Sequence, residues 1–156
     1  MAGELMAELF RAFSAVFPII IQTHGTTQKV LLHRRMNTGY QDGKLDIAAS
    51  GHVDDGETAT CAAVRECKEE LGIEVLASDL RFVHLSHRLG LDRTYYDIYF
   101  IVESFSGEPA IMEPEKCSEL LWCDLESLPD DVIECRSQVL HEYKLGNYYS
   151  EWREKP

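Results

Sequence analysis

Three glutamates recur at helical spacing between Gly51 and Ile73, in the segment GHVDDGETATCAAVRECKEELGI. At 100° per residue, Glu66, Glu69 and Glu70 fall within one arc of about 100°. Like charges three and four residues apart repel each other, so helix stability does not explain the cluster. Mg²⁺ takes carboxylate oxygens together with substrate phosphates. For the three glutamates alone, a solvated acidic helix face is the favoured interpretation, and a divalent-metal site is the alternative.

The residues that flank the glutamates favour the metal site. Gly51 lies six residues before Glu57, and Glu57 lies eight residues before Arg65. The complete spacing, G-x5-E-x7-R-E-U-x-E-E-x-G-U with U apolar, resembles the Nudix box of the MutT-like hydrolases. Seven fixed identities, at a usage of roughly 7% each, would coincide about once in 10⁸ positions by chance. Cys67 stands at an apolar position that usually carries an aliphatic residue, and cysteine buries well enough to replace one.

The resemblance implies a role for each matched residue. Mg²⁺, with Mn²⁺ as the alternative ion, would be the cofactor. Its ligands would be the backbone carbonyl of Gly51 and the carboxylates of Glu66, Glu69 and Glu70. Arg65 and Glu57 would pair and orient the loop against the helix as part of the catalytic machinery.

The general base is left open by the resemblance. A water activated by the metal would attack a phosphorus atom of a diphosphate, and a glutamate would take its proton. Some family members use a glutamate of the box, and others use one from a later loop. Within the box we expect Glu66 or Glu69. The later-loop alternatives are Glu113, Glu115 and Glu119.

The elements around the box predict an α+β fold. Val-, Ile- and aromatic-rich runs predict strands at 15–22, 29–34, 45–49, 80–88, 94–105 and 119–124. Helical spacing predicts helices at 2–13, 58–71 and 132–145, with a helical turn at 125–128. Gly72 is expected to end the second helix in a left-handed conformation, with Ile73 packing back. Pro18 suggests an edge strand or a bulge, because proline has no N–H for a sheet. The resemblance implies a Nudix fold, a mixed β-sheet sandwiched between α-helices, with residues 1–156 as a single Nudix hydrolase domain.

Composition limits the partners and the compartment. The net charge of −12 would repel DNA or RNA, so a nucleic-acid polymer is a poor candidate for the main partner. The apolar run between residues 12 and 22 is too short to span a membrane. The five cysteines include no C-x-x-C pair, which favours reduced thiols in a cytoplasmic protein.

Substrate contacts are less strongly indicated than the metal site. Arg34 and Arg35 end a predicted strand just before the loop at 37–43, and we expect them near the substrate phosphates. A solvated strand end is the alternative for both arginines. His84 and His87 are expected to be structural histidines rather than catalytic ones. Three aromatic side chains could stack on a base: Tyr40, Tyr96 and Trp122. Packing in the core is the commoner role for such residues.

The sequence predicts a small nucleotide-like substrate without identifying it. The chain lacks wide insertions, so we expect cleavage of a nucleoside triphosphate, including an oxidised one, to a monophosphate and pyrophosphate. The alternatives are ADP-ribose, a nucleotide-sugar or a dinucleoside polyphosphate. A non-catalytic nucleotide sensor and a purely structural acidic domain are further hypotheses, but the intact box favours the enzyme. By analogy with the family, the apolar N-terminal helix could serve a homodimer.

Overall fold

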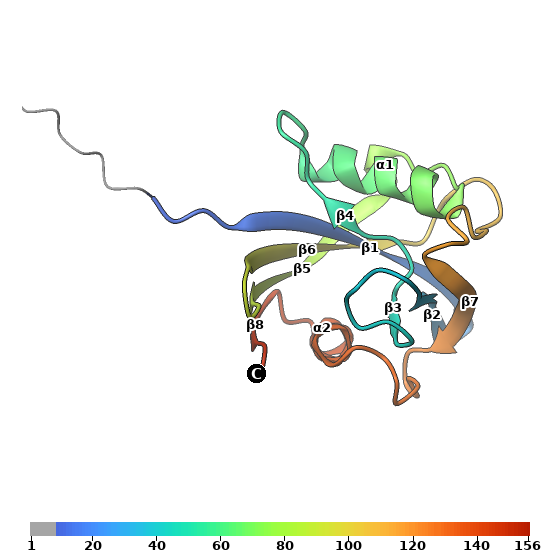
Figure 1. Ribbon diagram of the computed structural model, residues 1–156. Coiled ribbons are helices and arrows are strands. Elements are labelled where there is room, and N and C mark those ends of the chain that lie inside the picture. The colour runs from blue at the N-terminus through green and yellow to red at the C-terminus, as the bar shows by residue number, and fades with distance from the viewer. Residues whose placement is uncertain (1–8) are drawn as a thin grey trace, which may run out of the picture.

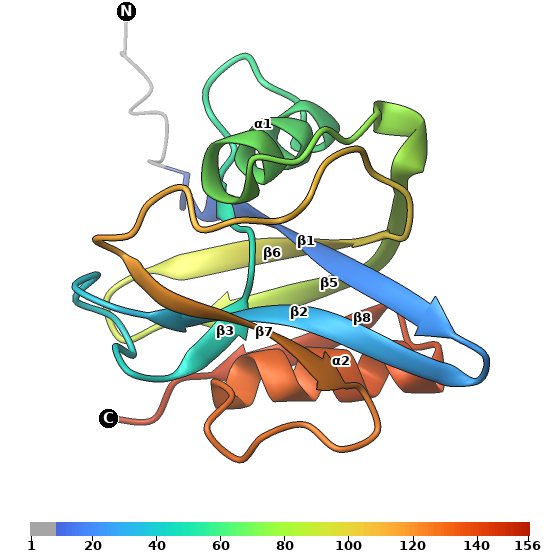
Figure 2. The same ribbon diagram turned by 90° about the vertical axis from the view of Figure 1, so that its right-hand side faces the viewer.

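An eight-stranded mixed sheet has one helix against each face (Figure 1, Figure 2). This computed structural model describes residues 9–156. The strands are β1 (Phe13–His24), β2 (Thr27–Arg35), β3 (Leu45–Ile47), β4 (Gly51–His52), β5 (Leu80–Leu89), β6 (Thr94–Val102), β7 (Cys117–Asp124) and β8 (Tyr149–Arg153). The helices are α1 (Ala59–Leu71), α2 (Glu134–Leu145) and a short 3₁₀ helix, η1 (Ala77–Asp79). The predicted α+β class is confirmed.

The strands follow the order β3-β2-β1-β6-β5-β8, with β4 paired to β1 and β7 paired to β2. Parallel pairing joins β1 to β6 and β5 to β8, and the other pairs are antiparallel. The strands predicted at 15–22 and 29–34 are β1 and β2, which form an antiparallel hairpin with a turn at His24–Thr27.

Strand β1 is buried on both faces. The side chains of Phe17, Ile19 and Ile21 pack in a cluster with residues of α2. Val16 and Ile20 point to the opposite face and pack in clusters with residues of α1. Because alternate residues of a strand point to opposite sides, burial of both sides produces the continuous apolar run of the sequence.

Helix α1 begins and ends where the sequence predicted. The hydroxyl of Thr58 accepts a hydrogen bond from the backbone N–H of Cys61 at 3.2 Å, which satisfies a donor of the first turn. Gly72 adopts φ = 69° and ends the helix. Cys67 and Leu71 pack against the sheet, and Ile73 packs in the same cluster. The packing of these apolar side chains fixes which side of α1 faces β4 and the loop before β4.

Pro18 does not mark an edge strand or a bulge, so that prediction was wrong. Strand β1 is interior and pairs with β6 without a register shift from Phe13 to Ile20. On its other side β1 pairs with β4 at Ala15 and Val16, and with β2 only from Ile21 onward. Pro18 lies between the part of β1 that pairs with β4 and the part that pairs with β2. On that side of β1, no neighbouring strand needs a backbone N–H from residue 18.

Other predictions need correction or lie outside the described residues. Residues 9–12 form no helix and Phe13 already begins β1, while the rest of the predicted N-terminal helix, 2–8, lies outside the described residues. Residues 125–128 form a turn and a bend rather than a helical turn, and β4 and β8 were not predicted. Within residues 9–156, neither α1 nor α2 is long and apolar enough to cross a membrane.

Candidate active site

Gly51 in β4 lies directly against Glu66 in α1. A Cβ at position 51 would lie only 2.0 Å from Oε1 of Glu66, so glycine leaves the space that the carboxylate fills. One turn further along α1, Oε2 of Glu70 accepts a hydrogen bond from the backbone N–H of Ser50 at 2.9 Å. The Ser50–Gly51 backbone and two glutamates of the box thus form one cluster.

Both carboxyl groups of this cluster lie where negative charge is disfavoured. Burial, with the nearby charges of Glu66 and Glu113, raises the pKa of Glu70 to about 8 against the opposing hydrogen bond from Ser50. Burial also raises the pKa of Glu66, although its hydrogen bond from Arg65 opposes the shift. Positive charge placed beside the two groups would favour their ionised forms.

Arg65 connects the loop to the helix. Its Nε and Nη2 donate to the two oxygens of Glu57 at 2.8 and 2.9 Å, as the resemblance implied. Its other contacts are the carbonyl of His52 at 3.1 Å, Oε1 of Glu66 at 2.7 Å and Oε2 of Glu69 at 3.3 Å. The bidentate pair holds the pKa of Glu57 at about 2, so Glu57 stays ionised and the loop stays attached to α1.

The donor atoms of the cluster suit a hard divalent cation. The carboxyl groups of Glu66 and Glu70 have oxygen atoms of the kind that Mg²⁺ takes, and the Ser50–Gly51 backbone lies beside them. Within residues 9–156, no three His, Cys, Asp or Glu side chains converge closely enough to hold a metal ion. Glu69 is paired with Arg65 at 3.3 Å, and its side chain is half exposed.

Replacing Gly51 with Ala is expected to weaken Mg²⁺ binding by about 10- to 100-fold, because the added methyl group displaces the carboxylate of Glu66. Isothermal titration calorimetry with MgCl₂ measures the effect. Gly25→Ala is the control: Gly25 has φ = 62° and no neighbouring atom within 4 Å. This control should cost about 1–2 kcal/mol of stability through backbone strain and leave Mg²⁺ affinity unchanged. Equal affinity in Gly51→Ala and wild type would contradict the placement of the ion.

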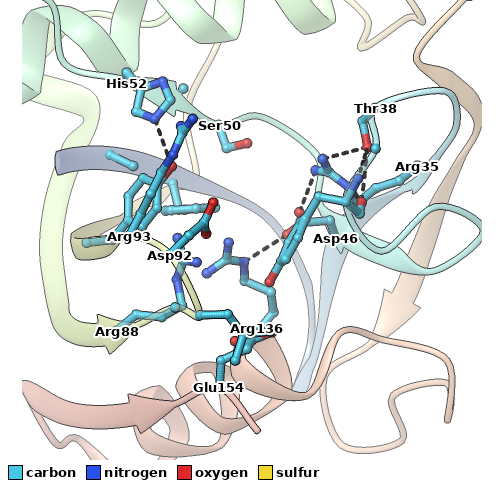
Figure 3. Close-up of a pocket in the computed structure, with 18 residues that line it drawn as sticks. Arg35, Thr38, Asp46, Ser50, His52, Arg88, Asp92, Arg93, Arg136 and Glu154 are labelled. Atoms are coloured by element: carbon cyan, nitrogen blue, oxygen red, sulfur yellow. Dashed lines mark hydrogen bonds and ion pairs between the residues drawn. The ribbon is translucent and has the colours of Figure 1, made fainter. Parts of the chain in front are cut away.

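Two cavities border the cluster. The larger, of about 600 Å³, reaches from Ser50 and Gly51 to Arg88 and Arg136 (Figure 3). The smaller, of about 420 Å³, is lined by Glu70, the loop before β7 and part of β2. Four residues line both cavities: Arg35, Thr38, Ser50 and His52. The acidic cluster therefore lies beside the wall that the two cavities share.

A chain of alternating charges lies beneath the larger cavity. Arg88 Nε donates to Asp97 Oδ2 at 2.6 Å, and Arg136 Nη1 donates to the same oxygen at 3.3 Å. Arg136 Nε donates to Asp46 Oδ1 at 3.0 Å, and Arg35 Nη1 donates to Asp46 Oδ2 at 3.0 Å. Burial by itself would raise the pKa of Asp46, but Arg136 and Arg35 outweigh it and hold the pKa below its ordinary value. The chain joins α2, β5 and β6 to the end of β2.

The two arginines expected at the substrate lie in different places. Arg35 lines both cavities, and its Nε donates to the carbonyl of Tyr40 at 2.7 Å. Arg34 lines neither cavity and forms ion pairs with Glu119 at 2.5 Å and Asp131 at 2.7 Å. Consecutive residues of a strand point to opposite faces, so only one of the two can face the cavities. The structure does not bring Arg34 to the site.

The later-loop glutamates also separate. Glu113 lines the smaller cavity together with Glu70. Glu119 pairs with Arg34 away from both cavities, and Glu115 lines neither of them. His84 is structural, as expected, because its two ring nitrogens contact Asn147 O at 2.8 Å and Ser150 Oγ at 2.7 Å.

Sequence reasoning missed the buried acidic partners of the arginines. Asp46 stands between Leu45 and Ile47, and Asp97 stands in the apolar strand β6. Both side chains are almost completely buried. A single acidic residue within an apolar strand was the available signal, because a buried carboxylate requires a partner. Arg136, their shared partner, carried no comparable signal in its amphipathic helix.

Comparison with known proteins identifies a matching family and similar solved structures. The family model described as NUDIX domain matches residues 13–143. A MutT NUDIX hydrolase from Burkholderia pseudomallei is 22% identical with a TM-score of 0.74, covering 85% of this chain and 98% of that one. The NUDIX domain of Shewanella oneidensis NrtR, complexed with ADP ribose, is 14% identical with a TM-score of 0.69, covering 88% and 89%.

A sequence relative is the dihydroneopterin triphosphate diphosphatase of Escherichia coli (strain K12). The two are 34% identical over an alignment of 82 residues, and the match covers 45% of this chain and 51% of that protein. The chain thus spans about half the length of the relative it matches.

Proposed function

Because this chain belongs to the NUDIX family, a family of hydrolases, we propose that it is a Mg²⁺-dependent pyrophosphohydrolase. The proposed reaction cuts a nucleoside triphosphate to a monophosphate and pyrophosphate. The observation that carries the proposal is the cluster of Glu66 and Glu70 against the Ser50–Gly51 backbone, beside the wall shared by the two cavities. The relative that acts on dihydroneopterin triphosphate supports a triphosphate substrate.

ADP-ribose, a nucleotide-sugar and a dinucleoside polyphosphate remain the alternative substrates. The complex of the Shewanella NUDIX domain with ADP ribose favours the first of these. In the proposed arrangement the diphosphate lies at the shared wall, and the rest of the substrate fills the larger cavity. A cavity of about 600 Å³ is within the usual range for small-molecule sites.

Each proposed role follows from the position of the residue. When bound, Mg²⁺ would neutralise the diphosphate and activate the attacking water. Arg35 and Lys116 line the smaller cavity and would bind phosphate oxygens. Arg65 keeps Glu57 and the carbonyl of His52 against α1, which fixes the loop that carries Gly51. Glu66, Glu69 and Glu70 remain the proposed metal ligands.

Glu113 is the later-loop glutamate that we propose as the general base, with Glu66 and Glu69 as the alternatives. It shares the smaller cavity with Glu70. Glu113→Gln should lower kcat by roughly 10²–10⁴-fold, because the amide cannot accept the proton of the attacking water. Steady-state pyrophosphate release measures this, and Glu115→Gln, on the same loop but outside both cavities, is the matched control. A kcat within twofold of wild type would return the role to Glu66 or Glu69.

An assay of phosphate and pyrophosphate release over a panel of nucleotides, with and without Mg²⁺, tests the proposed function. Release that needs Mg²⁺ supports the hydrolase. Nucleotide binding without release would support the sensor, and neither binding nor release would support the structural domain.

The remaining proposals concern the cellular compartment, the domain organisation and the partners of the enzyme. The five cysteines are free, and four of them are buried, which is consistent with the proposed cytoplasmic location. We also propose that residues 1–156 form a single Nudix hydrolase domain. The net charge of −12 supports small phosphate esters rather than nucleic-acid polymers as partners. Homodimerisation stays a prediction.

A further inference from the structure

We infer that the larger cavity selects a fused ring with a carbonyl oxygen beside a ring nitrogen acceptor, as in guanine or an oxopteridine, over a 6-amino ring such as adenine. The inference rests on the proposed function, because the ring can enter this cavity only if the diphosphate lies at the neighbouring acidic cluster. It concerns the part of the substrate that does not react.

Two buried arginines offer unused donors to the cavity. Arg88 bonds Asp97 through Nε and Nη2, and Arg136 bonds Asp46 and Asp97 through Nε and Nη1. Within residues 9–156, no hydrogen bond involves Nη1 of Arg88 or Nη2 of Arg136, although the two side chains are only 8% and 3% exposed. Both residues line the larger cavity (Figure 3). A guanidinium nitrogen donates and never accepts, so these positions require acceptors.

The two guanidinium groups are fixed in orientation. Arg88 Cζ lies 4.2 Å from the centre of the Tyr95 ring, and Arg136 Cζ lies 3.9 Å from the centre of the Phe17 ring. Each group is also held by a buried carboxylate, Asp97 in both cases. Because an aromatic ring stacks on one face of each guanidinium group and a carboxylate pairs with its edge, each group has little freedom to rotate. A ring that enters the cavity therefore meets donors that are already in place, which lowers the entropic cost of binding.

The edge of a 6-oxopurine complements these donors. Guanine presents O6 and N7, two neighbouring acceptors, whereas adenine presents the acceptor N7 beside an amino group that donates. An amino group opposite a guanidinium N–H would leave both donors unpaired, which is costly in a buried site. Asp92 and Glu154 line the same cavity and supply carboxylate oxygens for ring N–H groups. The cavity thus matches a ring that has an acceptor edge and a donor edge.

A purely anionic occupant fits less well. The charges of Arg88, Arg136 and Arg35 are largely balanced by Asp46 and Asp97. The carboxylates of Asp92 and Glu154 line the same space and offset the charge of Arg93, which also lines it. We therefore expect the ring, and not a phosphate group, to occupy the larger cavity.

The test compares kcat/KM of the wild-type enzyme for GTP, ATP, 7-deaza-GTP and 8-oxo-GTP with Mg²⁺. We expect GTP to exceed ATP by roughly tenfold or more, the discrimination typical of two donors that contact one base edge. 7-Deaza-GTP lacks the N7 acceptor, and 8-oxo-GTP carries a hydrogen on N7, so both should be poorer substrates than GTP. An unmodified ring is therefore preferred here over the oxidised one that the sequence left open.

Arg88→Lys tests the donor directly, because lysine keeps the charge and loses the planar fork. It should reduce the GTP/ATP ratio of kcat/KM by roughly tenfold, whereas Arg81→Lys, an exposed arginine on the same strand, should leave the ratio unchanged. Equal use of ATP, GTP and 7-deaza-GTP by the wild type would overturn the inference. So would an unchanged ratio in folded Arg88→Lys, and if that variant does not fold, the 7-deaza-GTP comparison decides. Absence of release from every triphosphate would instead remove the proposed function.

Discussion

Glu70→Gln is expected to abolish Mg²⁺-dependent turnover and to preserve the fold. The amide oxygen of glutamine can still accept the hydrogen bond from the N–H of Ser50, so the local geometry survives. The charge that would hold the ion is lost. We expect kcat to fall by roughly 10²–10³-fold or more, as when other preorganised electrostatic contacts are removed from active sites. Pyrophosphate release at saturating substrate and Mg²⁺ measures the loss.

Thermal unfolding separates loss of the ion from loss of the fold. Because ligands that bind only the native state stabilise it, Mg²⁺ should raise the Tm of the wild type and raise that of Glu70→Gln much less. Without Mg²⁺ the variant should be no less stable than wild type, because it no longer buries a carboxyl group whose ionisation is disfavoured. Glu74→Gln, at an exposed site paired with Lys68, is the matched control and should match wild type in both assays. Full turnover by Glu70→Gln would disprove the assigned role.

Arg136→Met is expected to lower the free energy of unfolding by about 3–5 kcal/mol, which is the usual effect of removing one partner from a buried ion pair. Arg136 is 3% exposed and bonds both Asp46 and Asp97. Methionine fills part of the volume and leaves each carboxylate with one arginine instead of two. The hydroxyl of Tyr99, which accepts a hydrogen bond from Arg136 at 2.8 Å, loses that partner as well.

Urea denaturation followed by circular dichroism measures this loss of stability. Arg34→Met is the matched control, because Arg34 also has two carboxylate partners but lies at the surface, where such pairs contribute little. We expect only a small change in the control. If Arg136→Met and Arg34→Met lower the free energy of unfolding equally, the buried ion pairs of Arg136 do not stabilise the fold more than surface pairs do.

Helix α1 and its ends could be predicted from local sequence alone. Three local signals predict the same helix. They are the apolar stripe with Cys67 and Leu71, the capping residue Thr58 and the terminal Gly72, and each acts within a few residues of its position. The pairing of Glu57 with Arg65 was implied by the resemblance of this segment to the Nudix box. These features are local, so no knowledge of the rest of the fold was needed.

Features that depend on distant partners could not be predicted. Strand β8, YSEWR, has no continuous apolar run and becomes a strand because it pairs in parallel with the edge of β5. At the other end, the helical spacing of Leu9 and Phe10 suggested a helix, yet both side chains are about 80% exposed and bury no apolar face. Phe13 instead pairs with Tyr95 of β6 and extends β1.

The site itself was only partly predictable for the same reason. The residues of the box lie within 23 positions and appeared together, whereas the charged floor of the larger cavity joins residues 39 and 90 positions apart. An arginine in an amphipathic helix is usually solvated, and only the fold places Arg136 beside Asp46 and Asp97. Alternation along β2 likewise separated Arg35 from Arg34, which the sequence had treated as a pair.

The partition formed by Arg35, Thr38, Ser50 and His52 bears on what happens after cleavage. If the substrate lies across these residues as proposed, cleavage would leave one fragment in each of the two cavities. Neither fragment would then have to wait for the other to depart. We therefore expect no compulsory sequence of product dissociation, and each product should inhibit without needing the other to be bound.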